Sequence, residues 1–210
     1  MINRIDALII QFDKAIRVLS GIPAQTGRTS PSDVVKEVPL SDKQQQESVA
    51  LMRVNHAGEV AAQALYHGQL ITAKGEALKN RLEVAAREEG DHLKWCTQRV
   101  EELGGKPSRL NGAWYTGAFI MGFFTGKMGD KWSLGFIAET ESQVVRHLQS
   151  HLKQLSERDK KSQAIILMMC DDEAAHQDNA ITAGGQPLPF FIRSLMAFNG
   201  KIMTSLSYYW

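Results

Sequence analysis

Two Glu-x-x-His motifs constrain this chain more than any other feature of its sequence. They are Glu89-Gly90-Asp91-His92 and Glu173-Ala174-Ala175-His176. Both lie in sequence with helical periodicity, where residues three apart share one face of the helix. Each motif can therefore aim a carboxylate and an imidazole at the same point, which makes it half of a candidate metal site.

A single glutamate precedes each motif at nearly the same distance. Glu59 lies 30 residues before Glu89, and Glu141 lies 32 residues before Glu173. In two antiparallel helices joined by a short turn, residues at the same height are equally far from that turn. The two midpoints fall beside a glycine, Gly75, and within a polar run, and both features favour a turn. Each glutamate is therefore predicted to face its own motif across a helical hairpin.

Two such hairpins would form a four-helix bundle with carboxylates and imidazoles in its interior. This donor set is that of di-iron and di-manganese carboxylate proteins. Carboxylates with a minority of imidazoles suit iron or manganese better than a thiolate-preferring metal, although zinc stays open. We therefore predict an all-α bundle with six metal ligands, namely Glu59, Glu89, His92, Glu141, Glu173 and His176.

Other polar and thiol residues adjoin these motifs. For His56, one turn before the first glutamate, a hydrogen-bonded role is favoured over ligation because six ligands are already supplied. Cys96 and Cys170 each lie one turn from a proposed ligand, and a buried apolar role is favoured for both. Glu139 lies about 200° around the helix from Glu141, so one of the two can face the metals. The apolar stripe of that helix selects Glu141.

Length, charge and cysteine content limit the possible folds and functions of the chain. Its 210 residues suffice for one domain with a sizeable core, and we expect that domain to span 41–210 after a separate segment, 1–40. A net charge of +1 gives no basic field, so nucleic acid is not an expected partner. Two cysteines fit a reducing compartment. No signal peptide is evident, and no apolar stretch is long enough to span a membrane.

The four bundle helices are expected at about 41–73, 77–103, 131–156 and 162–183. The first should begin at a capping box formed by Ser41 and Gln44, with a break in its first half. Before it, residues 2–19 form an amphipathic helix with an apolar stripe of Ile2, Ile5, Ile9, Phe12, Ile16 and Leu19. Packing against the domain and lying on a membrane or a partner explain this stripe equally well. Residues 20–39 show no period and are predicted to form a long connection.

Two apolar segments accompany the bundle. Residues 111–129 include a stretch that is apolar on all sides, with small residues at every fourth position, Ala118, Gly122 and Gly126. A buried crossover between the hairpins is one interpretation, and a surface in lipid or at the entry for an apolar substrate is slightly favoured. Residues 187–210 end in Tyr-Tyr-Trp, which suits a water–lipid interface. A core helix or a dimer contact is the alternative.

Several motifs together resemble the demethoxyubiquinone hydroxylase family of ubiquinone biosynthesis. They are Arg53-Val54-Asn55-His56-Ala57-Gly58-Glu59, then Tyr66 and Gly68-Gln69, then Glu88-Glu89-Gly90-Asp91-His92, and Gly129-Asp130-Lys131 ahead of Glu139-Thr140-Glu141. The resemblance covers about residues 40–210 in order. The first forty residues have no counterpart in it, and they lack the Arg-rich, acid-poor character of a mitochondrial presequence.

The resemblance implies a ferritin-like di-iron monooxygenase that hydroxylates the ring of a demethoxylated ubiquinol or ubiquinone precursor. It further implies two Fe ions per chain, O2 as co-substrate and an external reductant, for which NADH is one candidate. The implied partners are a lipophilic quinone, the cytoplasmic side of a bacterial inner membrane and other ubiquinone-biosynthesis proteins, with a homo-oligomer left open. The same six residues would be the iron ligands, with Glu89 and Glu173 as bridges.

Two further positions carry an expected role beside the metals. His147 matches a family position associated with electron delivery, although helical geometry fits a solvent-facing side chain equally well. The next residue is Leu148, where animal members of the family resemble one another in having tyrosine. Tyr66 is expected next to the site or in electron delivery. A ferroxidase or peroxide-reducing bundle with the same six ligands, and a membrane-bound scaffold, remain as other classes of function.

Overall fold

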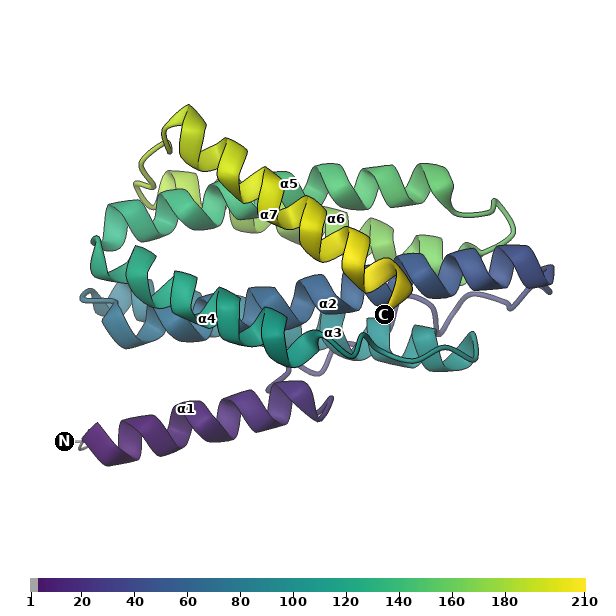
Figure 1. Cartoon of the computed structure of the whole chain (residues 1–210), viewed down its shortest axis with the longest axis horizontal. Helices are drawn as coiled ribbons and strands as arrows, with labels where there is room; N and C mark the ends of the chain where they lie inside the picture. The colour runs from purple at the N-terminus through teal and green to yellow at the C-terminus, as the bar shows by residue number, and fades with distance from the viewer. Residues whose placement is uncertain (1–3) are drawn as a thin grey trace.

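The structure, a computed structural model, describes residues 4–210, and the regular secondary structure in this range is entirely α-helical. Its helices are α1 (Arg4–Leu19), α2 (Asp42–Thr72), α3 (Glu76–Glu102), α4 (Asn111–Lys127), α5 (Asp130–Gln154), α6 (Lys160–Thr182) and α7 (Phe190–Tyr209). Helices α2 and α3 form one hairpin, α5 and α6 form a second, and α4 connects the two (Figure 1). The predicted helical hairpins are confirmed.

Local chemistry explains where the hairpin helices begin. Ser41 and Gln44 form the predicted capping box, with the backbone N–H of Ser41 donating to Gln44 Oε1 at 2.9 Å. The turn before α3 is held by Asp130, which accepts from the backbone N–H of Gly75 at 3.1 Å. Asp159 caps α6 by accepting from the backbone N–H of Ser162 at 3.1 Å. An acceptor at each of these helix starts satisfies a backbone N–H that has no partner inside the helix.

The predicted break in the first bundle helix is wrong. Helix α2 runs without interruption for 31 residues. Its buried side chains extend from Ser48 to Gln69, because α3 packs along one side of it and α4 along another. Tertiary packing of this extent stabilises a helix whatever the local propensity of single residues such as Gly58.

Helices α2 and α4 meet backbone to backbone. A Cβ atom at Gly122 would overlap the carbonyl group of Leu65, and one at Gly68 would overlap the carbonyl oxygen of Phe119. A Cβ at Gly126 would overlap the side chain of Thr72. The small residues of α4 thus let the two helices approach closely, as expected for this spacing. The other side of α4 is exposed, so the segment is both a packed crossover and an apolar surface.

Helix α1 packs through a different residue from those of its predicted stripe. Val18 is buried against Val60, Leu93 and Tyr115, which α2, α3 and α4 contribute. The stripe residues are exposed instead: Ile9, Phe12, Ile16 and Leu19. Ile2, also assigned to that stripe, lies outside the described residues, and the side chain of Ile5 is likewise not described. Helix α1 is therefore attached to the bundle at its carboxyl-terminal end, while the four described residues of its stripe are exposed.

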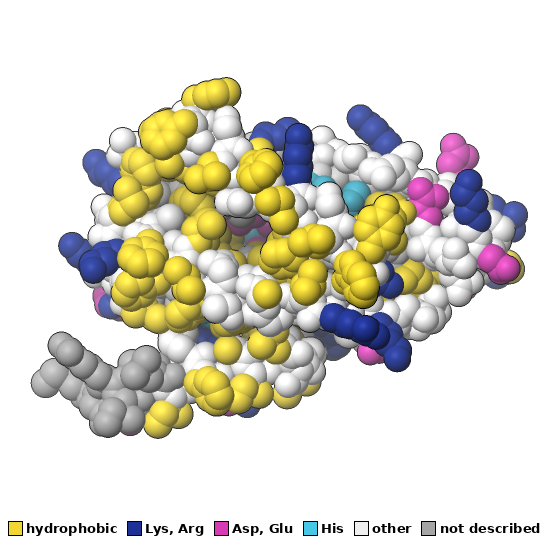
Figure 2. Space-filling model, viewed as in Figure 1, with side chains coloured by type: hydrophobic (Ala, Val, Ile, Leu, Met, Phe, Trp, Pro, Cys, Tyr) yellow, Lys and Arg dark blue, Asp and Glu magenta, His cyan; other side chains and the backbone are white. Residues whose placement is uncertain are grey.

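One face of the molecule is markedly apolar. Helices α4 and α7 lie on the viewed side in Figure 1, and Figure 2 shows hydrophobic side chains gathered over the same side. The exposed members on α7 and just after it are Phe190, Phe191, Leu195, Phe198, Ile202, Leu206, Tyr209 and Trp210. Within residues 4–210, none of the helices combines the length and the apolar character that crossing a membrane requires.

Candidate metal centre

The six predicted ligands come together in the middle of the bundle. Helix α2 contributes Glu59, α3 contributes Glu89 and His92, α5 contributes Glu141, and α6 contributes Glu173 and His176. They form two groups of four, and within each group one ligand atom from every residue lies within 4.8 Å of the others. All six side chains are buried. The sequence thus predicted correctly which residues meet, while their role as ligands stays a prediction.

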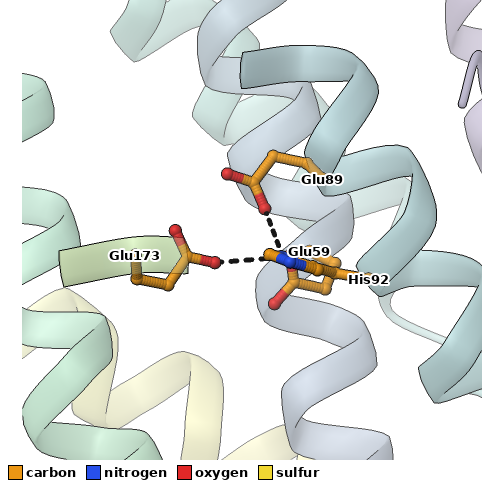
Figure 3. Close-up of side chains that lie close together, drawn as sticks. All are labelled: Glu59, Glu89, His92 and Glu173. Carbon is orange, nitrogen blue, oxygen red and sulfur yellow. Dashed lines mark hydrogen bonds and ion pairs between the residues drawn. The ribbon is translucent and has the colours of Figure 1, made fainter. Parts of the chain in front are cut away.

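Glu89 and Glu173 belong to both groups, and each presents one oxygen to each imidazole. Nδ1 of His92 lies 3.0 Å from Glu89 Oε2 and 3.1 Å from Glu173 Oε1. Nδ1 of His176 lies 3.2 Å from Glu89 Oε1 and 3.1 Å from Glu173 Oε2. Figure 3 shows the His92 group, with Glu89 and Glu173 converging on the imidazole from α3 and α6. This arrangement fits the expected bridging role of the two shared glutamates.

The outer nitrogen of each histidine is held by a carboxylate from the opposite helix. His92 Nε2 on α3 lies 2.8 Å from Asp172 Oδ2 on α6. His176 Nε2 on α6 lies 2.6 Å from Glu88 Oε2 on α3. When Nε2–H donates to a carboxylate, the lone pair of the neutral imidazole is on Nδ1. Both lone pairs then face the glutamates, which is the usual arrangement of a metal-binding histidine.

The electrostatics of the cage favour a cation inside it. Burial, together with the charge of neighbouring glutamates, raises the pKa of Glu59 and of Glu141 well above the usual range. Burial would also raise the pKa of Glu89, but its contacts with His176 and His92 lower it. Glu59 Oε2 is buried without a hydrogen-bond partner within residues 4–210, and His92 Nδ1 lies 3.7 Å from it. Metal cations would remove the repulsion and satisfy this oxygen, so the residues fit a metal pair.

Tyr66, His56 and Glu139 lie where their predicted roles require, and His147 fits one of its two predicted positions. Tyr66 donates a 2.6 Å hydrogen bond to Glu141 Oε1, which places it beside the cage. His56 is buried, pairs with Asn111 at 3.3 Å and belongs to neither group of four. Glu139 contacts Gln143 at 2.8 Å, outside the cage. His147 differs from the solvent-facing alternative, because it lies in a cavity wall with its ring 3.9 Å from that of His151.

Neither cysteine belongs to the groups that could hold a metal. Cys96 is fully buried with Sγ 3.8 Å from the sulfur of Met169, and Cys170 is partly buried. Burial raises the pKa of the Cys96 thiol well above its ordinary value. A protonated, buried thiol behaves as a small apolar side chain, so the predicted apolar role of Cys96 is confirmed.

The site also contains residues that sequence reasoning did not find. Arg28, in the connection between α1 and α2, donates to both oxygens of Asp172 at 3.1 and 2.7 Å. Asp91, inside the first motif, is buried and accepts from Gly27 and Thr26. No periodic signal could have identified Arg28. For Asp172 a signal existed, because it directly precedes Glu173 as Glu88 precedes Glu89.

An apolar cavity adjoins the cage. Its volume is about 550 Å³, and its lining includes the carboxylates of Glu59, Glu141 and Glu173. The remaining walls come from α2, α4, α5 and α7 and are mostly apolar, with Leu65, Met121, Phe136, Val144, Met196 and Met203 among them. Figure 2 shows a hollow in the apolar face with acidic side chains at its floor. A lipophilic molecule that entered here would reach the carboxylate cage directly.

Comparison with known proteins identifies the family. A family described as "Ubiquinone biosynthesis protein COQ7" matches residues 46–207. The chain belongs to this family. The segment that matches the COQ7 family contains all six residues of the cage. The resemblance that the sequence motifs indicated is therefore confirmed.

Individual relatives match more of the chain than the family segment does. The 3-demethoxyubiquinol 3-hydroxylase of Nitrosococcus oceani is 50% identical over 208 residues, which cover 99% of this chain and 97% of the relative. The protein of the same name from Nitrosomonas eutropha is 49% identical over 209 residues, with full coverage of both chains. The expectation that residues 1–40 have no counterpart is therefore wrong. These residues lie outside the motifs on which the resemblance rested, but relatives have them.

Proposed function

We propose that this protein is a di-iron monooxygenase that hydroxylates the ring of 3-demethoxyubiquinol in ubiquinone biosynthesis. The observation that carries the proposal is the apolar cavity with three cage carboxylates in its lining. A ferroxidase needs a route for hydrated ions and no apolar cavity of this size. The names of the relatives support the same activity. Together with the two hairpins, the cage supports assignment of the bundle to the ferritin-like class, with two Fe ions per chain.

Bound in this cage, two iron ions would supply the oxygen chemistry, in which one oxygen atom of O2 replaces a ring hydrogen as hydroxyl and the other leaves as water. The balance requires two electrons and two protons, which an external reductant such as NADH would provide. The residues that would hold the ions are Glu59, Glu89, His92, Glu141, Glu173 and His176. The apolar walls of the cavity exclude water from the reacting ring.

Polar groups in the cavity wall would orient the quinol ring. His147 lines the cavity, and its Nε2 is buried without a hydrogen-bond partner within residues 4–210. Asn55 also lines the cavity, and its Oδ1 lies 2.7 Å from Nδ1 of His151, the ring next to His147. Burial lowers the pKa of His147, so its imidazole is neutral near pH 7 and can accept or donate one hydrogen bond. Donating and accepting a hydrogen bond both suit a ring that carries hydroxyl and methoxy groups.

The apolar face supports peripheral attachment to the cytoplasmic side of a bacterial inner membrane. Exposed hydrophobic side chains of α4, α7 and α1 would enter the lipid interface, where tyrosine and tryptophan such as Tyr209 and Trp210 are favoured. Arg146 and Lys201 belong to the cavity lining and would meet anionic headgroups at its mouth. A quinol with an isoprenoid tail could then pass from the bilayer into the cavity without crossing water.

The decisive experiment compares quinone extracts of cells that lack the gene and carry plasmid-borne variants. The wild-type chain should restore ubiquinone, whereas Glu141→Gln should leave a demethoxylated quinone accumulating. Glu139→Gln is the matched control, because Glu139 lies two residues away and outside the cage. Iron content of the purified proteins is measured in parallel. A normal quinone profile in cells without the gene would refute the hydroxylase assignment.

A further inference from the structure

Residues 24–28 form a strap that crosses α3 next to His92. The carbonyl of Ala24 packs directly on Gly90, where any Cβ atom would overlap it. Thr26 Oγ1 and the backbone N–H of Gly27 donate to the carboxylate of Asp91, the latter at 3.1 Å. The strap is therefore fixed to the two residues that precede His92, although it is more than sixty residues away in sequence.

Arg28, the last residue of the strap, connects α3 with α6. Its two terminal nitrogens donate to both oxygens of Asp172 at 3.1 and 2.7 Å, and its Nε lies 3.4 Å from Asp91. Its guanidinium group also lies 5.0 Å from the ring centre of Trp95. Two parallel hydrogen bonds and a stacked face are interactions that the planar guanidinium makes and an ammonium group does not. Arg28 thus fixes both the position and the rotation of the Asp172 carboxylate.

Asp172 in turn holds the imidazole of His92, with its Oδ2 2.8 Å from Nε2. The hydrogen-bonded chain therefore runs from Arg28 through Asp172 to His92, whose Nδ1 faces the cage. Within residues 4–210, no arginine supports the other half of the centre in this way. Glu88, the corresponding carboxylate, is about one-third exposed, and its ion-pair partner within the described residues is His176.

We propose that Arg28 is a positioning residue for the His92 half of the metal centre, so that the two metal positions bind their ions with different affinity. The strap holds Asp172, and Asp172 holds the imidazole in the orientation in which Nδ1 can bind a metal. Partners of this kind affect metal affinity by about 10- to 100-fold in other metalloproteins. The inference rests on the proposed function, because it assumes that the cage binds two ions.

The test measures binding of Fe(II) alone, without quinone, under anaerobic conditions. Arg28→Gln should weaken one of the two binding steps by about 10- to 100-fold and leave the other unchanged. With ⁵⁷Fe, one of the two Mössbauer doublets should change. Glu88→Gln should weaken the other step and alter the other doublet. Arg17→Gln, which removes an exposed arginine of α1 that pairs with Asp13, should bind both ions as the wild type does.

Further variants separate positioning from a merely structural role. Arg28→Lys keeps the charge but not the two parallel hydrogen bonds, so it should recover part of the lost affinity. Asp172→Asn should weaken the same step as Arg28→Gln, and it carries the test if Arg28→Gln does not fold. Equal weakening of both steps, together with a lower unfolding midpoint in chelator, would show that the strap only stabilises the fold and would overturn the proposal.

Two results distinguish this inference from the proposed function. If the wild-type protein binds two ions and Arg28→Gln binds them with unchanged affinities and spectra, only the role of Arg28 is refuted. If the wild-type protein binds no metal, the di-iron function and this inference fall together. Neither readout depends on hydroxylase turnover.

Discussion

The hydroxyl group of Tyr66 on α2 donates a 2.6 Å hydrogen bond to Oε1 of Glu141 on α5. Both side chains are almost completely buried, so the hydrogen bond orients a carboxylate of the cage without competition from water. It is also a direct link between the two hairpins at the level of the site. A tyrosine here therefore serves the orientation of a ligand as well as the packing of the core.

Tyr66→Phe should preserve packing and remove this hydrogen bond. Because a metal ligand loses its partner, we expect hydroxylation to fall about 10- to 100-fold. The free energy of unfolding should fall by about 1–2 kcal/mol. Single-turnover product formation and urea unfolding measure the two effects. Tyr115→Phe is the control, because Tyr115 pairs with His67 away from the cage and should keep full activity. Equal activity of both variants would exclude a role for Tyr66 at the site.

The two shared glutamates predict a difference in metal content among alanine variants. Glu173 belongs to both groups of four, whereas Glu141 belongs to one. Glu173→Ala should therefore lose both ions and all hydroxylation while remaining a helical protein. Glu141→Ala should retain about one ion per chain. Iron content and circular dichroism of the purified variants check this, and product formation by Glu173→Ala would refute its assignment as a ligand.

The exposed rings of α7 predict binding to lipid. Burial of one phenylalanine side chain contributes about 1.5–3 kcal/mol, so removing two rings should weaken vesicle binding by more than tenfold. The variant is Phe191→Ser with Phe198→Ser, measured by co-sedimentation with vesicles of phosphatidylethanolamine and phosphatidylglycerol. Val84→Ser on α3 removes an exposed apolar side chain from another helix and should bind like the wild type. Unchanged sedimentation of the double variant would remove α7 from the membrane surface. Truncation after Gly185, which deletes α7 altogether, should weaken binding further.

The close contact between α2 and α4 predicts opposite effects for two glycines of α4. Gly122→Ala places a methyl group against the backbone of Leu65, and such overpacking costs about 1–3 kcal/mol. Gly117→Ala meets open space within the same helix and should stabilise the protein by about 0.5–1 kcal/mol. Urea unfolding of the two variants measures the sign of each change. Stabilisation by both substitutions would mean that helix propensity and not contact decides the effect.

The bundle and its cage were predictable from sequence because their signals are local and periodic. Three-residue spacing defined the motifs, and equal distances from a turn paired Glu59 with Glu89 and Glu141 with Glu173. The strap was not predictable, since residues 20–39 have no period and the partners of Arg28 lie far away in sequence. The outward orientation of the α1 stripe could not be predicted either. Hydrophobic periodicity identifies an apolar face but not what covers it.

The crossed pairing of His92 with Asp172 and of His176 with Glu88 has a consequence for how the protein folds. Each hairpin has its motif locally, but the imidazole of each is oriented by the other. Each hairpin supplies three of the six residues, but a complete group of four forms only when α3 and α6 have docked. Contacts at such sequence separation are slow to form because the intervening chain must first be ordered. Binding of iron by a complete group of four should accordingly be a late event, which follows the synthesis of α6 in a nascent chain.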